Sequence, residues 1–300
     1  MKGNLSPTEK TKFLSFILCD GGDNTIVIFD KKGNFIKKFG RKGQGPGDLS
    51  RPTKITVFNN NLLVYDSSNY RFQVFTLDGE FIKAYRAFSL SEFGAKMWIT
   101  KNGNYYVSTE GYNSENLIIQ RSLNGKIKGR YGKTYGKKQN VYVFETNLVK
   151  KGIVPNSYKN KVFPVADKDN FVYCIHSALP IIKKYDSLNN LIWKRELNLP
   201  HLDLIKKNWI EINKRNTRPN MSIQLIYWKD IEMDEFGNIY LLANIPNRMI
   251  VYCMNTNGDI LAYFSGVMDN ISMISIHKNE MWAFGRDSQI FYKYFLKTMK

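Results

Sequence analysis

Residues 25–85 read TIVIFDKKGNFIKKFGRKGQGPGDLSRPTKITVFNNNLLVYDSSNYRFQVFTLDGEFIKAY, and they contain one pattern twice. The run IVIFDKKGNFI at 26–36 returns as FQVFTLDGEFI at 72–82, so that the turn glycines Gly33 and Gly79 lie 46 residues apart. A strand–turn–strand unit that returns at a fixed period indicates a repeat fold. This period is about the length of four short strands with their turns, which is the size of one β-propeller blade.

The second copy is the complete one, and it defines the repeating unit. Four strand-like runs, at 54–58, 62–66, 71–75 and 81–85, are separated by turn residues. Gly125 follows Gly79 by another 46 residues, the fourth and fifth copies come at longer intervals, and a sixth copy ends after its third strand. Each four-stranded unit needs neighbours to cover its faces, which radial stacking supplies. We therefore predict an all-β fold, one six-bladed β-propeller over residues 1–300, with blades at approximately 13–40, 54–86, 96–132, 162–197, 230–265 and 272–297.

Two insertions explain why the fourth and fifth turns arrive late. Residues 133–161 carry seven lysines and one acidic residue, which predicts a basic loop. Residues 198–228 place Leu202, Ile205, Trp209 and Ile212 at spacings of three and four, which predicts a short amphipathic helix. We expect its apolar stripe to pack on the propeller, with a protein partner as the alternative.

Charge is the most informative feature of the composition. There are 44 Lys and Arg residues against 26 Asp and Glu, which gives a formal net charge of +18. A surface this basic favours anionic partners such as nucleic acid, acidic glycans or anionic lipid headgroups. A lysine-rich composition that only keeps the protein soluble explains the charge equally well. No window approaches the roughly 18 apolar residues that span a bilayer, and the first residues lack the apolar core of a secretory leader.

Residues 39–58, FGRKGQGPGDLSRPTKITVF, resemble the connector between blades of NHL-repeat propellers. More narrowly, they resemble a bacterial six-bladed β-propeller family that has a Gly-Gln-Gly-Pro-Gly connector. Residues 64–75, VYDSSNYRFQVF, are similar to the NHL pattern of strand, Asp-x-x-Asn-x-Arg, strand, and Asn247-Arg248 repeats part of it. The resemblance implies a propeller and a general binding role, in a family whose members are mostly exported, and it brings no catalytic residue.

Neither the cysteines nor the histidines form a recognisable catalytic or metal-binding set. Each of the three cysteines lies inside an apolar run, which is typical of buried thiols. His176 and His201 are expected near one face of the propeller and His277 near the other, so the three cannot share a zinc ion. We therefore predict no metal, no cofactor and no catalytic residue. A site made of carboxylate and amide groups stays an alternative, because four acidic residues at strand ends are expected on the same face as His176 and His201. These residues are Asp20, Asp66, Glu110 and Asp230.

Basic residues do show an arrangement. Four lysines fall within one residue of the predicted start of an innermost strand, where successive blades converge on the mouth of the central channel. A ring of ammonium groups there would concentrate an anionic ligand, although boundary lysines that simply face water are the alternative. The candidate ligand-binding residues are Lys54, Lys96, Lys161 and Lys229, with Arg51 nearby and with Arg71 and Arg248 of the NHL-like pattern.

The first and sixth blades are expected to be incomplete. Counting back from Gly33, the innermost strand of the first blade should begin near residue 8, but residues 8–12 are too polar for a buried strand. Only residues 297–300 follow the third strand of the sixth blade. Residues 3–12 are therefore predicted to pair at the edge of the sixth blade, or else to lack an upstream strand because the chain is truncated.

These features together predict a binding or scaffold propeller, expected to be monomeric, that presents a basic face to an anionic ligand or a protein partner. Tyr135, Tyr142 and Phe144 stand among the lysines of the first insertion, where aromatic rings can stack on the bases of single-stranded nucleic acid. An acidic glycan is the ligand expected if the protein is exported to the periplasm or cell surface. The alternative is a metal-dependent propeller hydrolase or lyase of the lactonase kind.

Overall fold

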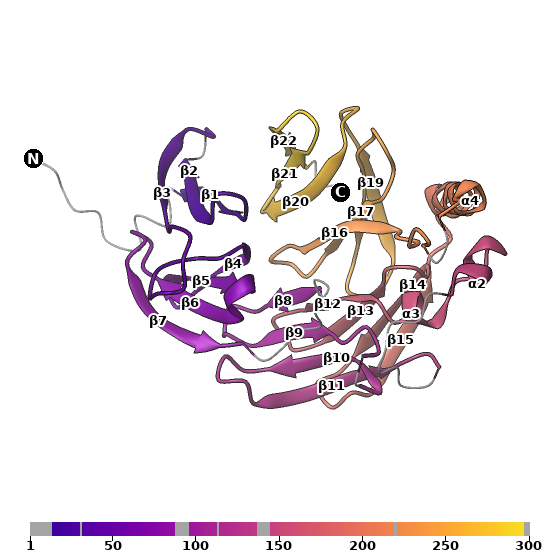
Figure 1. The fold of residues 1–300 in the computed structure, drawn as a ribbon, viewed down its shortest axis with the longest axis horizontal. Helices are drawn as coiled ribbons and strands as arrows, with labels where there is room; N and C mark the ends of the chain where they lie inside the picture. The colour runs from indigo at the N-terminus through magenta and orange to yellow at the C-terminus, as the bar shows by residue number, and fades with distance from the viewer. Residues whose placement is uncertain are drawn as a thin grey trace, which may run out of the picture. The chain divides into compact units, whose positions relative to one another are not determined.

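The computed structural model describes residues 14–30, 32–87, 96–112, 114–136, 145–218 and 221–296. The described strands form six antiparallel sheets of three or four strands, and within each sheet the strands follow one another in sequence order (Figure 1). These are the six blades of a β-propeller, so the predicted fold class is confirmed.

The first three sheets lie between residues 14 and 133. Their strands are β1 (Leu14–Asp20), β2 (Thr25–Asp30) and β3 (Phe35–Phe39); β4 (Pro52–Phe58), β5 (Asn61–Asp66), β6 (Arg71–Phe75) and β7 (Phe81–Arg86); and β8 (Met97–Ile99), β9 (Tyr105–Ser108), β10 (Asn116–Arg121) and β11 (Ile127–Lys133). One short 3-10 turn, η1 (Ser67–Asn69), connects β5 to β6.

The other three sheets lie between residues 162 and 295. Their strands are β12 (Val162–Ala166), β13 (Val172–His176), β14 (Ile181–Tyr185) and β15 (Leu191–Glu196); β16 (Trp228–Met233), β17 (Ile239–Ala243), β18 (Ile250–Met254) and β19 (Ile260–Ser265); and β20 (Ile271–His277), β21 (Glu280–Gly285) and β22 (Ile290–Phe295). The described helices are α2 (Thr146–Lys150), α3 (Asn156–Lys159) and α4 (Pro200–Arg215).

Two compact units make up the chain. The first comprises residues 1–94, 99–106 and 120–128, and the second comprises residues 95–98, 107–119 and 129–300. The boundary passes through the third sheet, so β8 to β11 contribute residues to both units. The single domain over residues 1–300 stays a prediction.

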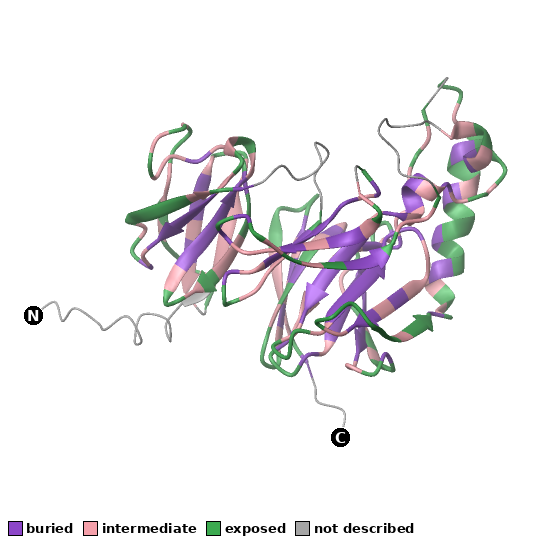
Figure 2. Cartoon of the chain, turned by 90° about the horizontal axis from the view of Figure 1, so that it is seen from below, coloured by how far each residue is buried: buried purple, intermediate pink, exposed green. Residues whose placement is uncertain are grey.

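Burial differs sharply between the middle and the outer strands of a blade. β13 and β17 are buried along their whole length, and β5 along all but its first residue, whereas the fourth strands β7, β15 and β19 are mostly exposed (Figure 2). A strand covered on both faces tolerates a continuous apolar run, as in the IYLLA of β17. Of these fourth strands, β7 and β15 carry lysine and arginine on their exposed positions.

In the first blade, strand register identifies which strands are present. β1 ends with Asp20 opposite Thr25, in the same way that β5 ends with Asp66 opposite Arg71. The pairing of β2 with β3 also slips between Ile28 and Phe29, the repeat positions that correspond to Val74 and Phe75, where the pairing of β6 with β7 slips in the second blade. β1, β2 and β3 therefore correspond to the second, third and fourth strands of a blade. The segments 8–12 and 297–300 lie outside the described residues, so both alternatives for the closure stay predictions.

Helix α4 forms in the second insertion as predicted, but its buried face differs by one residue. Leu202, Ile205 and Trp209 are buried, whereas Ile212 is 48% exposed and Asn213 is buried in its place. A helix has 3.6 residues per turn, so eleven residues complete three turns and bring position 213, not 212, beneath position 202. The buried residues of α4 join the core formed by the fourth and fifth blades, as expected.

Asn213 holds the return segment of this insertion against the helix. Its Oδ1 accepts from the Ile223 N–H at 2.8 Å, and its Nδ2 donates to the Ile223 carbonyl at 3.0 Å. Trp209 Nε1 donates to the same carbonyl at 2.7 Å. The first insertion is also more ordered than the predicted basic loop, because it contains α2 and α3.

Candidate ligand-binding surface

Lys161 lies just before β12, and its ammonium group has two partners. Nζ donates to Gln224 Oε1 at 3.0 Å and lies 3.6 Å from Glu110 Oε2. The Lys161 and Glu110 side chains are only 20% and 14% exposed. Burial raises the pKa of the Glu110 carboxyl, and the charge of Lys161 acts in the opposite direction. The charge of Lys161 is therefore largely matched within the chain.

Lys229, near the start of β16, is bound in a similar way. Its Nζ donates to Asn270 Oδ1 at 2.7 Å and to the Ile245 carbonyl at 3.3 Å. Desolvation lowers the pKa of this lysine, against the charges of two nearby aspartates. Lys161 and Lys229 thus share an arrangement that we call the lysine–amide bridge. In each, a lysine at the first strand of one blade donates to a side-chain amide oxygen in the segment that leads into the next blade.

The other two lysines of the predicted ring have different surroundings. Lys96 Nζ lies 4.7 Å from the centre of the Phe163 ring, and its charge also acts to lower the pKa of Glu110. Lys54 is exposed and belongs to the first unit, as does Arg51, whose N–H donates to Asn24 Oδ1 at 2.8 Å. The second unit thus holds three of the four lysines, and the complete ring stays a prediction.

Arg71 is a scaffold residue of the glycine-rich connector. Its Nε donates to the fully buried Asp66 carboxylate at 2.8 Å. Its two terminal nitrogens donate to the carbonyls of Gln44, Gly45 and Asp48 at 2.8 to 2.9 Å. Four of its five N–H groups are thereby used, so we do not include Arg71 in the ligand site.

Arg248 is not the counterpart of Arg71, which corrects the repeated pattern inferred from Asn247-Arg248. Arg71 is the first residue of β6, eight positions before the turn glycine Gly79. The residue eight positions before Gly258 in the fifth blade is Ile250, the first residue of β18. Arg248 lies two residues earlier, in the exposed loop.

A second group of lysines surrounds Tyr135. The backbone of Tyr135 is fixed by the buried Asn160, whose Oδ1 accepts from its N–H at 2.7 Å and whose Nδ2 donates to its carbonyl at 3.1 Å. Lys183 Nζ lies 5.3 Å and Lys159 Nζ 5.8 Å from the centre of the ring. Lys194 pairs with Lys183 across β14 and β15, and its charge opposes the burial that raises the pKa of Tyr135. We call Tyr135, Lys159, Lys183 and Lys194 the Tyr135 cluster.

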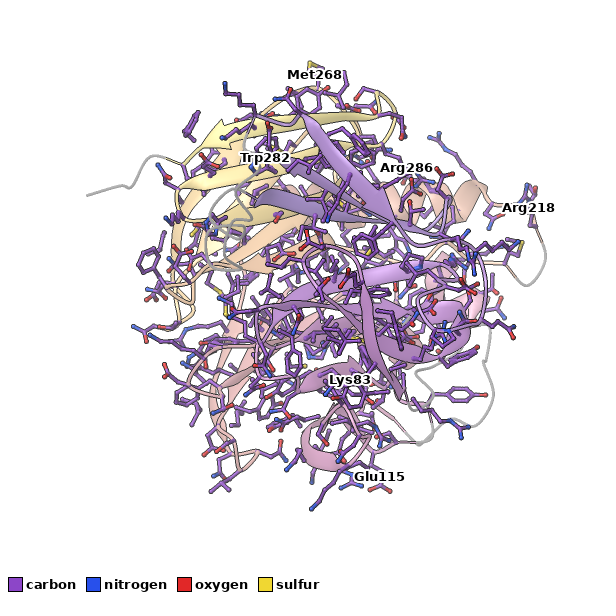
Figure 3. All side chains as sticks on the ribbon, turned by 90° about the vertical axis from the view of Figure 1, so that its left-hand side faces the viewer. Lys83, Glu115, Arg218, Met268, Trp282 and Arg286 are labelled. Atoms are coloured by element: carbon purple, nitrogen blue, oxygen red, sulfur yellow. The ribbon has the colours of Figure 1, made fainter. Side chains whose placement is uncertain are left out.

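The lysines of this cluster differ from Lys161 in their partners. Within the described part of the chain, the ammonium groups of Lys183 and Lys194 make neither a hydrogen bond nor an ion pair, and that of Lys159 donates only to Asn156 Oδ1, at 3.2 Å. Like charges directly opposite on neighbouring strands repel each other. Lys83 on β7, labelled in Figure 3, gives a comparison from another blade. It is exposed, and its Nζ lies 5.2 Å from the centre of the Tyr85 ring. The Tyr135 cluster is therefore a local excess of positive charge beside a fixed aromatic ring.

His176 lies beneath this cluster and is fully buried. Its ring packs edge-on against Tyr135, and Nδ1–H donates to the Lys159 carbonyl at 2.8 Å. Burial lowers the pKa of His176 to about 4, and the charges of Lys183 and Lys194 add to that shift. The imidazole is therefore neutral at pH 7, and it supports Tyr135 as a structural residue.

The histidines and cysteines show no assembled catalytic site. Over the described ranges, no three His, Cys, Asp or Glu side chains lie close enough to hold a metal ion. His201 hydrogen-bonds through Nδ1 to the Tyr252 hydroxyl, away from His176. The cysteines are free thiols, and burial raises the pKa of Cys19 and of Cys174 to about 12, which keeps these thiols protonated.

Sequence reasoning named Tyr135 but missed Lys183 and Lys194. The signal was present in β14, which reads IIKKY where the third strands β6 and β18 read RFQVF and IVYCM. Two adjacent lysines in a strand that is otherwise covered on both faces need a specific environment. The Lys184 ammonium group has such an environment, because it lies 4.2 Å from the centre of the Phe171 ring. The Lys183 ammonium group lies over the Tyr135 ring instead.

The fold and this surface define a six-bladed propeller with a basic cluster on its fourth blade. Residues 10–197 match the model of a family described as six-bladed β-propellers. Since this match covers more than half of the chain, the chain belongs to that family. No curated protein sequence matches the chain.

Solved structures share the fold at low sequence identity. One is a catalytically inactive virginiamycin B lyase from Staphylococcus aureus with quinupristin, 11% identical, with a TM-score of 0.51, covering 95% of this chain and 85% of that one. Another is a protein of unknown function from Bacteroides caccae, 10% identical, with a TM-score of 0.50, covering 94% and 90%. At these identities the likeness shows the fold alone. None of the described helices is long and apolar enough to cross a membrane.

Proposed function

We propose that the protein is a binding module whose Tyr135 cluster takes an anionic ligand. The observation that carries the proposal is the presence of two cross-strand lysines, Lys183 and Lys194, that have no carboxylate partner among the described residues. Their mutual repulsion is unfavourable in the free protein, and an anion placed between them relieves it. Tyr135 offers a fixed apolar ring beside that charge.

Sequence composition around the cluster supports the same conclusion. Residues 137–144, which follow Tyr135, contain two lysines and no Asp or Glu, so they bring no opposing charge. The formal net charge of +18 adds a long-range attraction for any polyanion.

We also assign the connector at 39–58 to the NHL type, on the Asp66–Arg71 pairing that its Asp-x-x-Asn-x-Arg pattern produces. Tyr142 and Phe144, which were expected with Tyr135 to stack on the bases of single-stranded nucleic acid, lie outside the described residues.

The test is a binding measurement over a salt series with two polyanions, a single-stranded RNA and an acidic polysaccharide. We expect binding at low salt, with log K falling linearly as log salt rises. The double variant Lys183→Met/Lys194→Met should reduce the magnitude of that slope by about 0.7 for each lysine that contacts the polymer, taking the single-strand value.

The control is Lys168→Met, which removes an exposed lysine from the β12–β13 turn, at the other end of β13 from His176. It should leave the slope within error of the unchanged protein. If neither polyanion binds at low salt, the charge serves solubility, and a protein partner becomes the better hypothesis. The metal-dependent hydrolase or lyase has no specific observation in its favour, although one similar structure is a lyase.

A further inference from the structure

Gln224 carries a hydrogen-bond donor that nothing in the described chain satisfies. Its Oε1 accepts from Lys161 at 3.0 Å, while its Nε2 is buried and has no partner among the described residues. Buried amide N–H groups are almost always paired, because leaving one unpaired costs its full desolvation. A ligand oxygen next to Nε2 would remove that cost.

Glu110 is held beside the same lysine by a strained turn. Glu110 and Gly111 have φ angles of 54° and 77°, and the Tyr112 N–H donates to the Thr109 carbonyl to close the turn. A Cβ atom at Gly111 would lie 2.5 Å from Asn160 Nδ2, so the turn is pressed against the residue that fixes Tyr135. Left-handed backbone at a non-glycine residue is uncommon and is found preferentially at functional sites.

Segment 159–161 connects this group to the Tyr135 cluster. Lys159 lies near the Tyr135 ring, Asn160 binds the Tyr135 backbone, and Lys161 binds Glu110 and Gln224. Two residues of chain span at most about 7 Å, so the Cα atoms of Lys159 and Lys161 lie within that distance of each other and the two groups are close in space. A donor, an acceptor, a fixed aromatic ring and unpaired ammonium groups thus lie within reach of one extended ligand.

We propose that this surface binds an oligosaccharide that carries carboxylate groups, with its uronate carboxylates on Lys183 and Lys194. The apolar face of a sugar ring packs on Tyr135, and the hydroxyls of the next sugar donate to Glu110 and accept from Gln224 Nε2. This inference rests on the proposed function and names the ligand class of the same site. A polynucleotide fits less well, since its closely spaced phosphates would approach the Glu110 carboxylate, which repels them.

The experiment compares three probes on the full chain by calorimetry at low salt. The first is an oligomer of galacturonic acid, the second is its methyl ester, which keeps the hydroxyls and loses the charge, and the third is a polyacrylate of equal charge without hydroxyls. We expect the galacturonate oligomer to bind at least about tenfold more tightly than either of the others. A single-stranded RNA of equal charge is a fourth arm and should bind more weakly than the galacturonate oligomer.

Glu110→Gln then separates hydroxyl recognition from simple charge. Removing a negative charge should tighten the binding of any anion that is held by electrostatics alone. If Glu110 accepts sugar hydroxyls, the same change weakens galacturonate binding by about tenfold and does not weaken polyacrylate binding. Should this variant unfold on thermal melting, the comparison of probes on the unchanged protein still decides.

The outcomes are distinguishable. Equal binding of polyacrylate, RNA and galacturonate, with tighter binding of all three by Glu110→Gln, would overturn the uronate assignment and leave anion binding intact. Binding of none of the charged probes would overturn the proposed function itself. Preference for the galacturonate oligomer, lost on esterification and weakened by Glu110→Gln, supports both.

Discussion

Lys161 and Lys183 belong to the same blade, and the contrast between them shows what makes a lysine available to a ligand. Lys161, just before the first strand of the blade, is held by Glu110 and Gln224. Lys183, on the third strand, faces Tyr135 and a second lysine, without a carboxylate among the described residues. Position at the start of a blade's first strand is therefore a poorer guide to ligand binding than the lack of an internal partner.

Arg71 extends the contrast to a cation whose loss should be the most costly. Replacing it with methionine leaves the buried Asp66 carboxylate without its ionic partner and breaks three hydrogen bonds to connector carbonyls. We expect Arg71→Met to lower the free energy of unfolding by about 3–5 kcal/mol in urea titrations. Anion affinity at the Tyr135 cluster should not change.

The control for this variant is Arg86→Met. Arg86 pairs with Arg71 across β6 and β7, and its side chain is exposed. Its loss should change the unfolding free energy by less than about 0.5 kcal/mol. Equal effects of the two changes would show that the connector does not depend on the Asp66–Arg71 pair.

His176 provides a probe of the charge that Lys183 and Lys194 create. Its pKa is about 4 in the folded protein and 6.5 without the protein environment, so the unfolded chain binds a proton that the folded chain does not. Stability from this residue is full above pH 6.5 and is lost as pH falls toward 4, by about 3 kcal/mol in total. The exposed aspartates whose pKa values are lowered change the free energy of unfolding only at still lower pH, where their carboxylates become protonated.

Urea titrations between pH 7 and pH 4 should show this loss, and His176→Asn, which keeps a donor and cannot titrate there, should reduce it. Lys183→Met should raise the pKa of His176, because it removes a nearby positive charge. An unchanged His176 titration in that variant, followed by NMR, would show that Lys183 does not act on the ring.

The smallest effects compare the two lysines directly. Lys161→Met should destabilise the protein by about 1 kcal/mol, because it breaks a mostly buried ion pair and a hydrogen bond. Lys183→Met should leave stability unchanged or slightly higher, since it relieves repulsion with Lys194, and should weaken polyanion binding. Thermal melting and the salt series measure both. If both variants lose the same stability, Lys183 has a structural partner and the contrast fails.

The blades could be predicted from sequence because their signal is local. The alternation of a strand and the glycine of a turn are read within a few residues of the element that they specify. The 46-residue period then appears because the same local signals recur along the chain. The face of α4 was predicted one residue out at Ile212, because a spacing of three or four fits the 3.6-residue turn equally well over short lengths. Arg248 was misaligned because two adjacent letters matched a pattern whose register depends on strand pairing.

The site was predicted less well, because the hydrogen-bond and ionic partners of each lysine determine whether it is available to a ligand. Those partners are distant in sequence. Gln224 lies 63 residues after Lys161, and Asn270 lies 41 residues after Lys229. No local pattern indicates that these amides will meet those lysines. Tyr135 was identified by its basic surroundings in the sequence, whereas two of its three neighbouring lysines come from strands of the next blade.

The lysine–amide bridge has a direction, and that direction bears on how such a chain can grow. In both cases the donor belongs to the earlier blade and the acceptor to the segment that enters the later one. A duplicated blade that includes its leading segment would carry both an acceptor amide and a donor lysine. Tandem copies would therefore be able to form the same bridge with each other without new contacts. Every such bridge would run from the earlier blade to the later one, because gene duplication keeps the direction of the chain.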